Sequence, residues 1–171
     1  MQNYFEHFGI PIAHEIDLSL LRKKYYEKSR EFHPDINQNK PDLDFHTAYN
    51  NQAYKILLNP LSRLKYIIEL TEGPIQENTQ TLPQEFLIQM MELHEAIFEA
   101  KELQDTKQLN RLMEELSLAE TNAQNKIHPI FRDFDQGNRD PEILNQMKFY
   151  YFKLKYFIRL RENLSNSESE I

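Results

Sequence analysis

The sequence predicts an all-α protein with an N-terminal helical hairpin followed by a C-terminal three-helix bundle. Apolar residues recur every three or four positions along most of the 171 residues, which is the spacing of amphipathic helices. Residues that favour helices, such as Leu, Glu, Lys and Gln, are abundant. Glycine occurs only 3 times, and no two glycines lie close together, which excludes the phosphate-binding loops of Rossmann and P-loop proteins.

Four helices are predicted in the first half of the chain. A short one over residues 4–8 should end at Gly9, which can take the left-handed conformation of a C-cap. The second covers residues 17–32 and begins at Asp17, a good N-cap. Its predicted buried arc consists of Leu18, Leu21, Tyr25, Ser29 and Phe32. A third helix is expected near residues 44–58, with Ala53, Tyr54 and Leu57 on one side, and a shorter one follows the break at Pro60.

A linker is predicted where Gly73 and Pro74 open a polar stretch rich in turn residues. We therefore expect a first domain over residues 1–73, a linker over 74–82 and a second domain over 83–171, with a frayed tail from about residue 165. There are nine basic and ten acidic residues before the boundary, and eleven basic and seventeen acidic residues after it. The acidity of the chain, which has a net charge of −7, thus lies mostly in the second domain.

Three helices are predicted in the second domain. In the first of them, Phe86, Met90, Leu93 and Ile97 cluster on one side and should face the core. The second helix follows from apolar residues at helical spacing: Leu109, Leu112, Met113, Leu116, Ala119, Ala123, Ile127 and Ile130. Pro129 lies inside this repeat and is interpreted as a kink or an end. The third helix should begin near Pro141, after a turn over residues 136–138.

In this acidic protein, the face of the 17–32 helix opposite its predicted buried arc carries five cations against Glu27 and Glu31, a net charge of +3. Its cations are Arg22, Lys23, Lys24, Lys28 and Arg30. By themselves they fit an ordinary solvated helix surface. The tripeptide His33-Pro34-Asp35 follows at once, and because proline disfavours the α conformation in the residue before it, the helix should end at His33.

This order of elements resembles a J domain, the module by which co-chaperones engage a DnaK-class ATPase. A short helix, a basic helix, the His-Pro-Asp loop, an antiparallel helix and a further short helix follow one another. The alternative is a generic helical hairpin with a chance tripeptide. The resemblance implies that His33, Pro34, Asp35 and the five cations bind the chaperone and promote its ATP hydrolysis, the chemistry being done by the chaperone.

The resemblance narrows to the HscB-type co-chaperones of iron-sulfur cluster assembly and covers nearly the whole chain. The residues similar to the start of that family are Tyr4-Phe5 and Phe8-Gly9-Ile10-Pro11. Those similar to its third and fourth helices are Asn51-Gln52-Ala53-Tyr54, Leu57, Pro60, Arg63 and Tyr66-Ile67-Ile68. Those similar to its scaffold-binding helix are Phe86-Leu87-Ile88, Met91-Glu92-Leu93 and Glu95. This last match discriminates best, because other J proteins lack that second domain.

Three residues depart from the family pattern. Ile36 follows the tripeptide where lysine is common, Leu64 stands where alanine is common, and His94 replaces a frequent arginine. These departures concern details of partner contacts rather than the module. The cysteine-rich N-terminal extension of some eukaryotic relatives is missing, and the simpler reading is a bacterial-type protein.

The predicted helix near residues 86–97 also has the composition of a recognition surface. Leu87, Ile88 and Met91 leave the predicted core side and adjoin Glu92 and Glu95, so that an apolar strip runs into a carboxylate-bearing face. A broad core face with one isolated exposed isoleucine is the alternative. The resemblance implies that these five residues and Tyr156 bind the scaffold.

Several function classes are excluded or disfavoured by composition. Cysteine is absent, which excludes disulfides, thiolate metal sites and cysteine nucleophiles. The six histidines lack metal-ligand spacing, so we expect neither a metal nor another cofactor, and we expect no intrinsic enzyme activity. The net charge of −7 argues against nucleic acid, and no apolar run is long enough for a membrane span. The chain is expected to be a cytoplasmic monomer.

The resulting hypothesis is a two-site adaptor. Its partners would be a DnaK/HscA-class ATPase chaperone, stimulated through the His-Pro-Asp loop, and an IscU-type scaffold protein, delivered by the second domain to assist cluster assembly or transfer. The alternatives are a J-domain co-chaperone that serves another client, and a structural helical module.

Overall fold

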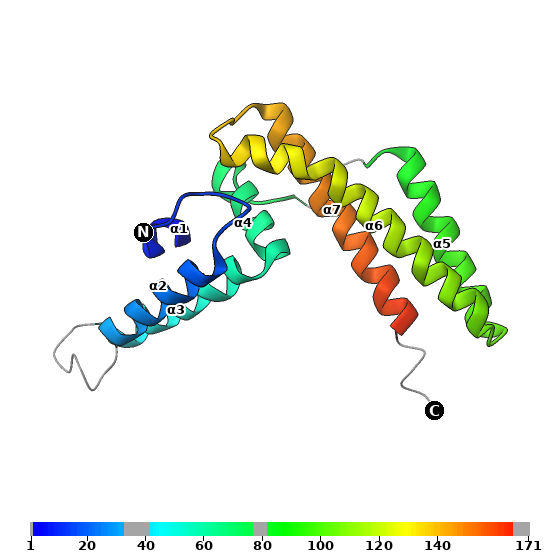
Figure 1. The fold of residues 1–171 in the computed structure, drawn as a ribbon, viewed down its shortest axis with the longest axis horizontal. Coiled ribbons are helices and arrows are strands. Elements are labelled where there is room, and N and C mark those ends of the chain that lie inside the picture. Colours follow the sequence, from blue (N-terminus) through cyan, green and yellow to red (C-terminus); the bar gives the residue numbers. More distant parts are fainter. Residues whose placement is uncertain (1, 33–41, 77–81, 166–171) are drawn as a thin grey trace. The chain divides into compact units, whose positions relative to one another are not determined.

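The computed structural model describes residues 2–32, 42–76 and 82–165. All of its regular elements in these ranges are helices: α1 (Tyr4–Phe8), α2 (Leu18–Glu31), α3 (Leu43–Leu58), α4 (Pro60–Glu72), α5 (Gln84–Glu102), α6 (Thr106–Asp135) and α7 (Pro141–Ser165). The predicted all-α class is therefore confirmed (Figure 1). The described chain divides into two compact units. The first comprises residues up to 75 together with 131–138, and the second comprises 76–130 and the residues from 139 onward.

Local sequence signals start and stop the helices of the first unit. Asn3 and Glu6 form a capping box at α1, and Gly9 ends that helix in the left-handed conformation at φ 63°. The Asp17 side chain accepts hydrogen bonds from the backbone N–H groups of Ser19 and Leu20 and so caps α2. Asn59 caps α4 in the same way through the N–H of Ser62, and Pro60 occupies the first turn of that helix.

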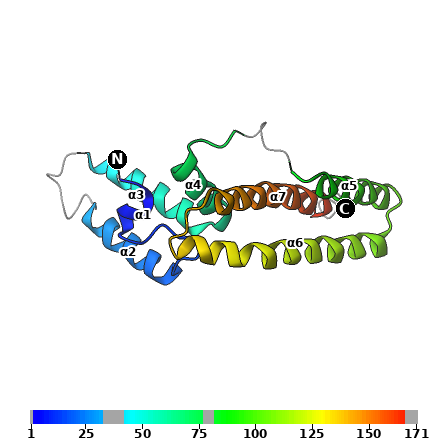
Figure 2. The ribbon, with the colours of Figure 1, turned by 90° about the horizontal axis from the view of Figure 1, so that it is seen from above.

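Helices α2 and α3 lie side by side and run antiparallel, as the sequence predicts (Figures 1 and 2). The buried apolar residues of this unit include Phe5, Phe8, Leu21, Ala53, Leu57, Leu64, Ile67 and Ile68. The prediction for Leu18 was wrong, because this first residue of α2 is exposed. Leu18 and Leu21 lie on the same side of the helix, because they are three residues apart. The first turn of a helix can nevertheless extend beyond the neighbouring helix that covers its middle. Helix α2 itself ends at Glu31, with Phe32 as its C-cap.

The C-terminal end of α6 belongs to the first unit and is tied to the segment between α1 and α2. The Asp135 carboxylate accepts the backbone N–H groups of His14 at 2.6 Å and Glu15 at 2.9 Å. The rings of His14 and Phe131 stack with centroids 3.6 Å apart. The buried Arg63 side chain donates from Nε to the carbonyl of His14 at 2.8 Å and from Nη1 to the carbonyl of Leu57. Burial lowers the pKa of Arg63, and the nearby Asp135 charge raises it.

The second unit is a bundle of α5, α7 and most of α6 (Figure 2). Its core contains buried residues from all three helices: Met90, Leu93, Ile97, Ala100, Leu112, Leu116, Phe157, Leu160 and Leu164. Three of the four predicted core residues of α5 are buried, and Phe86 packs against the core while partly buried. Helix α6 runs through Pro129 to Asp135, which excludes a helix end, one of the two alternatives predicted at this proline. Proline donates no backbone hydrogen bond there, but the helical conformation continues beyond it.

Candidate partner-binding sites

The residue that precedes the His-Pro-Asp tripeptide is firmly held in the first unit. The tripeptide itself, like Ile36, lies outside the described residues. Phe32 is buried and donates its backbone N–H to the carbonyl of Lys28 at 3.0 Å. Its ring stacks with the ring of His46, with centroids 5.0 Å apart, and with the ring of His7, with centroids 6.3 Å apart. Phe32, the last described residue before the tripeptide, is therefore packed against α1 and α3.

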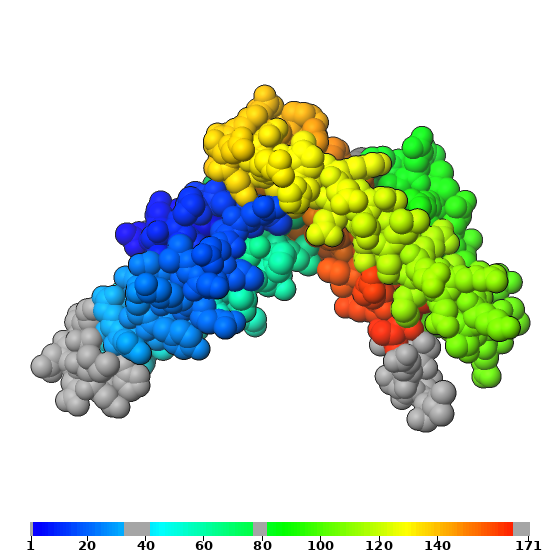
Figure 3. Space-filling model, in the orientation of Figure 1, coloured from blue at the N-terminus to red at the C-terminus, as the bar shows by residue number. Residues whose placement is uncertain are grey.

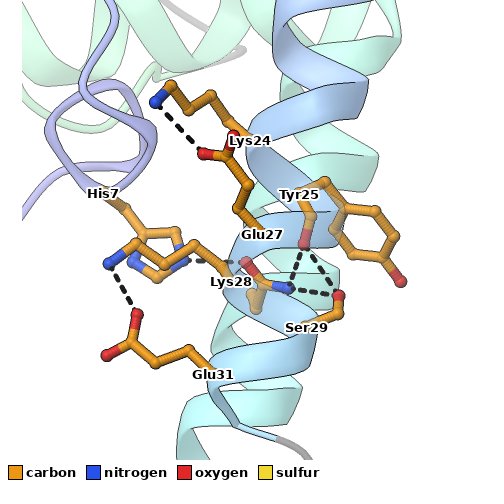
Figure 4. Close-up of polar contacts among 8 residues, drawn as sticks. His7, Lys24, Tyr25, Glu27, Lys28, Ser29 and Glu31 are labelled. Atoms are coloured by element: carbon orange, nitrogen blue, oxygen red, sulfur yellow. Dashed lines mark hydrogen bonds and ion pairs between the residues drawn. The ribbon is translucent and has the colours of Figure 1, made fainter.

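A polar network connects α1, α2 and α3 beside Phe32 (Figure 4). Asn50, which is fully buried, accepts at Oδ1 from the His7 ring at 2.9 Å. Its Nδ2 donates to Ser29 Oγ at 3.0 Å, and the Ser29 hydroxyl donates to the carbonyl of Tyr25 at 2.8 Å. Because the Asn50 oxygen accepts this bond, the His7 nitrogen that faces it is the protonated one. The buried amide thus has partners on both of its atoms, which makes its burial tolerable.

Burial is the main influence on the pKa of His7 and lowers it from the ordinary value of 6.5. The hydrogen bond to Asn50 raises the pKa. Lys28 and His46 lower it further, and Glu31 raises it. The neutral imidazole is therefore the form that the folded unit favours.

The structure separates the five cations of α2 into two groups. Lys24 is bound to Glu27 at 3.2 Å, and Lys28 is bound to Glu31 at 3.3 Å, both on the side of α2 that faces α1 (Figure 4). Arg22 and Lys23 line a different surface hollow together with Tyr26. Arg30 is exposed two turns after Arg22 on the same side of the helix. In the space-filling view α2 lies at the surface of the first unit (Figure 3).

Sequence reasoning missed Tyr26, which is exposed among the second group of cations. The signal was present, because Tyr26 lies four residues after Arg22 and four before Arg30, and such residues share one face of a helix. An exposed aromatic ring within a basic face can supply apolar contact area to a partner that the charges attract. We name Arg22, Lys23, Tyr26 and Arg30 the basic face of α2.

The predicted scaffold-binding residues lie largely at the surface of the second unit. Ile88 is 46% exposed and Met91 is 63% exposed, while Leu87 is half-buried. Glu92 and Glu95 are exposed beside them. The structure thus shows more than one isolated exposed isoleucine on this helix.

Tyr156 reaches the same helix from α7. It is half-buried against the core, and its ring meets the edge of Phe86 with centroids 5.9 Å apart. Lys153 Nζ lies 5.3 Å from the centroid of the Phe86 ring. Phe86 precedes Leu87 directly, so Tyr156 lies next to the first turn of α5. Phe98, a further exposed apolar residue of α5, was not predicted.

The described ranges contain neither a membrane-spanning helix nor a cluster of metal ligands. No helix there is both long and apolar enough to cross a membrane. In the same ranges, no group of three or more His, Cys, Asp or Glu side chains is arranged to hold a metal ion. His94, one of the departures from the family pattern, is exposed on α5, and Leu64 is fully buried in the first unit.

Comparisons with known proteins agree on one family. A family model described as the HSCB C-terminal oligomerisation domain matches residues 82–165. The co-chaperone protein HscB homolog of Azoarcus sp. (strain BH72) is 34% identical over 118 residues, a match that covers 65% of this chain and 66% of that relative. The co-chaperone protein HscB of Proteus mirabilis (strain HI4320) is 27% identical over 176 residues, which cover 99% of this chain and 97% of the relative.

Two solved structures share the fold. The crystal structure of human co-chaperone protein HscB aligns with a TM-score of 0.78 at 22% identity, covering 100% of this chain and 84% of that chain. Chaperone HscB from Vibrio cholerae aligns with a TM-score of 0.70 at 24% identity, covering 99% of both chains. These two structures show the fold. The family model over the second half of the chain and the curated relative that matches nearly its whole length show that the protein belongs to the HscB family of co-chaperones.

Proposed function

We propose that this co-chaperone joins two proteins of iron-sulfur cluster assembly. Its first unit binds a DnaK/HscA-class chaperone and stimulates ATP hydrolysis by that chaperone. Its second unit binds an IscU-type scaffold protein and delivers it to the chaperone. One observation carries the proposal: two surfaces of opposite charge, the basic face of α2 and the acidic, apolar side of α5, belong to different compact units of one chain.

At the first surface the chain supplies binding and orientation, and the chemistry belongs to the chaperone. The exposed cations Arg22, Lys23 and Arg30 attract an acidic partner and orient it during encounter. The stacked Phe32 holds the start of the segment that contains His33 and Asp35. We assign the directional hydrogen bonds to the side chains of His33 and Asp35, and we assign to Pro34 the restriction of the backbone between them.

At the second surface, Ile88 and Met91 are the exposed apolar anchors, Leu87 is half-buried beside Ile88 in the chain, and Tyr156 contacts Phe86 in the first turn of the same helix. Glu92 and Glu95 form a charged rim that selects a basic partner. Because both surfaces are on one chain, a scaffold bound to the second unit has a raised local concentration at the chaperone bound to the first.

Single-turnover ATPase measurements test the proposal. The chaperone is mixed with this chain, with the scaffold, or with both, and scaffold binding is measured separately by calorimetry. We expect stimulation by the chain alone and a larger effect with both proteins. Stimulation without any scaffold binding would identify a J-domain co-chaperone for another client, and binding without stimulation would leave only a scaffold-binding module.

A further inference from the structure

Phe98 is the feature of the second unit that the functions assigned so far do not use. Its side chain is 63% exposed, although it directly follows Ile97, which is 2% exposed in the bundle core. A large aromatic ring held in water gains nothing for folding, whereas at an interface such rings contribute much of the binding energy.

Phe98 continues the line of the exposed apolar residues of α5. Ile88, Met91, Glu95, Phe98 and Glu102 follow one another at spacings of three and four residues, which keeps them on one side of a helix. At 1.5 Å per residue, the line from Ile88 to Phe98 is about 15 Å long. This spacing is the one with which a helix presents a seam to another elongated segment.

The charge beside this line has a single sign. Glu92, Glu95, Glu99 and Glu102 are all exposed on it or next to it. Among the described residues, no ion pair is recorded for any of these four carboxylates. The nearest lysine of the helix, Lys101, instead donates to the carbonyl of Asn163 on α7. The surface that we call the α5 stripe is therefore made of Ile88, Met91 and Phe98 together with these four glutamates.

We propose that Phe98 is a third apolar anchor of the scaffold-binding surface and that the scaffold segment it receives is basic. The inference rests on the scaffold function proposed above and makes it more specific. The occupant of the α5 stripe is a segment about 15 Å long, with apolar side chains at its centre and Lys or Arg side chains that pair with the four glutamates. An acidic segment, or a small ligand without such a length, does not fit this pattern.

Replacing Phe98 with Ala tests the anchor, and Leu118→Ala is the matched control. Leu118 is 61% exposed on α6, so it has nearly the same exposure as Phe98 but lies on another helix. Loss of an interface anchor is expected to weaken scaffold binding about tenfold, measured by calorimetry, and Leu118→Ala should change it less than about twofold. Both variants should keep the melting temperature of the parent, because neither side chain is in the core.

Direct contact can be observed by fluorescence, because the chain contains no tryptophan. Phe98→Trp places a single indole on the α5 stripe, and Leu118→Trp places one on α6. Addition of the scaffold, with its own emission subtracted, should shift the emission of the first variant to shorter wavelength and leave that of the second unchanged. In parallel, Glu102→Gln should weaken binding at low salt and reduce its dependence on ionic strength.

The outcomes separate this inference from the function on which it rests. If the parent chain binds the scaffold and Leu87, Ile88 and Met91 matter while Phe98→Ala and Phe98→Trp show no effect, the scaffold function stands and the role of Phe98 is refuted. If the parent chain does not bind the scaffold, the scaffold function and the role of Phe98 are both refuted. If sedimentation shows that the parent chain self-associates and that Phe98→Ala makes it monomeric, the stripe joins two copies of this chain, and the proposed occupant is wrong.

Discussion

Helix α2 of the first unit and helix α5 of the second unit present similar surfaces with opposite charge. On α2 an exposed tyrosine lies among Arg22, Lys23 and Arg30. On α5 exposed Met91 and Phe98 lie among four glutamates. In both cases aromatic or apolar side chains at the centre are surrounded by side chains that carry charge of one sign. An apolar centre with a polar rim is typical of specific protein interfaces.

The opposite signs would allow one chain to distinguish its two proposed partners. An acidic patch on a partner is attracted by α2 and repelled by α5, and a basic patch behaves the other way round. Repulsion at the wrong site contributes to specificity as much as attraction at the right one. The two helices also differ in how far their charges are already neutralised. Glu27 and Glu31 pair with two lysines of α2, while the described residues give no such partner to the glutamates of the α5 stripe.

The largest effect is expected from His33→Gln, which should remove the activity of the first surface and leave that of the second. His33→Gln should abolish stimulation of the chaperone ATPase, because a glutamine amide does not reproduce the two ring nitrogens of histidine. Scaffold affinity should stay within about twofold of the parent value, since the other unit carries that surface. The measurements are single-turnover ATP hydrolysis and calorimetry. Loss of both activities would mean that His33 supports the fold and that the two surfaces are not independent.

The converse variant carries Ala at Leu87, Ile88 and Met91. Removing three apolar side chains should weaken scaffold binding by about a hundredfold or more, and ATPase stimulation without scaffold should persist. Because Leu87 is half-buried, circular dichroism should be used to confirm that the triple variant keeps its helix content. The double variant with Ala at Ile88 and Met91 leaves Leu87 unchanged and serves as a second test. Unchanged affinity in the double and triple variants would refute the proposed surface.

The third prediction compares two groups of cations on α2. Replacing Arg22, Lys23 and Arg30 with Ala should slow association with the chaperone about tenfold at low salt. Replacing Lys24 and Lys28 should have a smaller effect, because each is already paired with a glutamate. Stopped-flow association rates over a series of ionic strengths would show this difference. Effects in proportion to the number of charges removed, three against two, would indicate that only the total charge of α2 matters.

Asp135 tests where the boundary between the units lies. Asp135→Ala removes the acceptor of the His14 and Glu15 N–H groups and should lower the free energy of unfolding by about 1 to 3 kcal/mol. Asp135→Asn retains one acceptor oxygen and should cost less. Urea denaturation provides the measurement, with Asp133→Ala on the same helix end as control. A negligible effect of Asp135→Ala would show that the end of α6 is not needed by the first unit.

The smallest expected effect is the pH dependence from His7. Its pKa in the folded unit is lowered from 6.5, so between the two values the unfolded chain binds more protons. The stability that neutral His7 contributes is therefore present above about pH 6.5 and is lost as the pH falls below this value. Denaturation at pH 7.5 and 5.5 should show a smaller loss for His7→Gln than for the parent. The exposed His94 offers the control variant His94→Gln, and an identical pH dependence for His7→Gln and the parent would contradict the assignment.

Helix boundaries were predictable because their signals are local. Gly9, Asp17, Pro60 and Pro141 each act on the turn next to them, and the structure shows a helix beginning or ending at each. Proline inside α6 was harder to interpret, since the same residue can end, bend or merely interrupt the hydrogen bonds of a helix. The outcome depends on whether packing on both sides favours continuation, which a local pattern does not contain.

The burial of individual side chains was less predictable than the helix boundaries. Periodicity placed Met90, Leu93 and Ile97 in the core, because the side that faces a bundle follows from angle alone. It also predicted burial for Leu18, which is exposed. The position of a residue around the helix axis does not indicate how far the neighbouring helix extends along that axis. Tyr26 and Phe98 were missed because an aromatic residue within an amphipathic helix is usually assumed to be buried.

Residue types and their spacing were sufficient to predict the all-α class, the ends of most helices and the uneven distribution of charge between the two halves, and the His-Pro-Asp tripeptide is visible in the sequence directly. These features depend on residues within a few turns of chain. Packing determines which cations of α2 are paired, that Phe98 extends the exposed line of α5, and that Asp135 is bound to N–H groups more than a hundred residues away. Each of these depends on which surfaces meet after folding, and that is a property of the packed chain rather than of any local pattern.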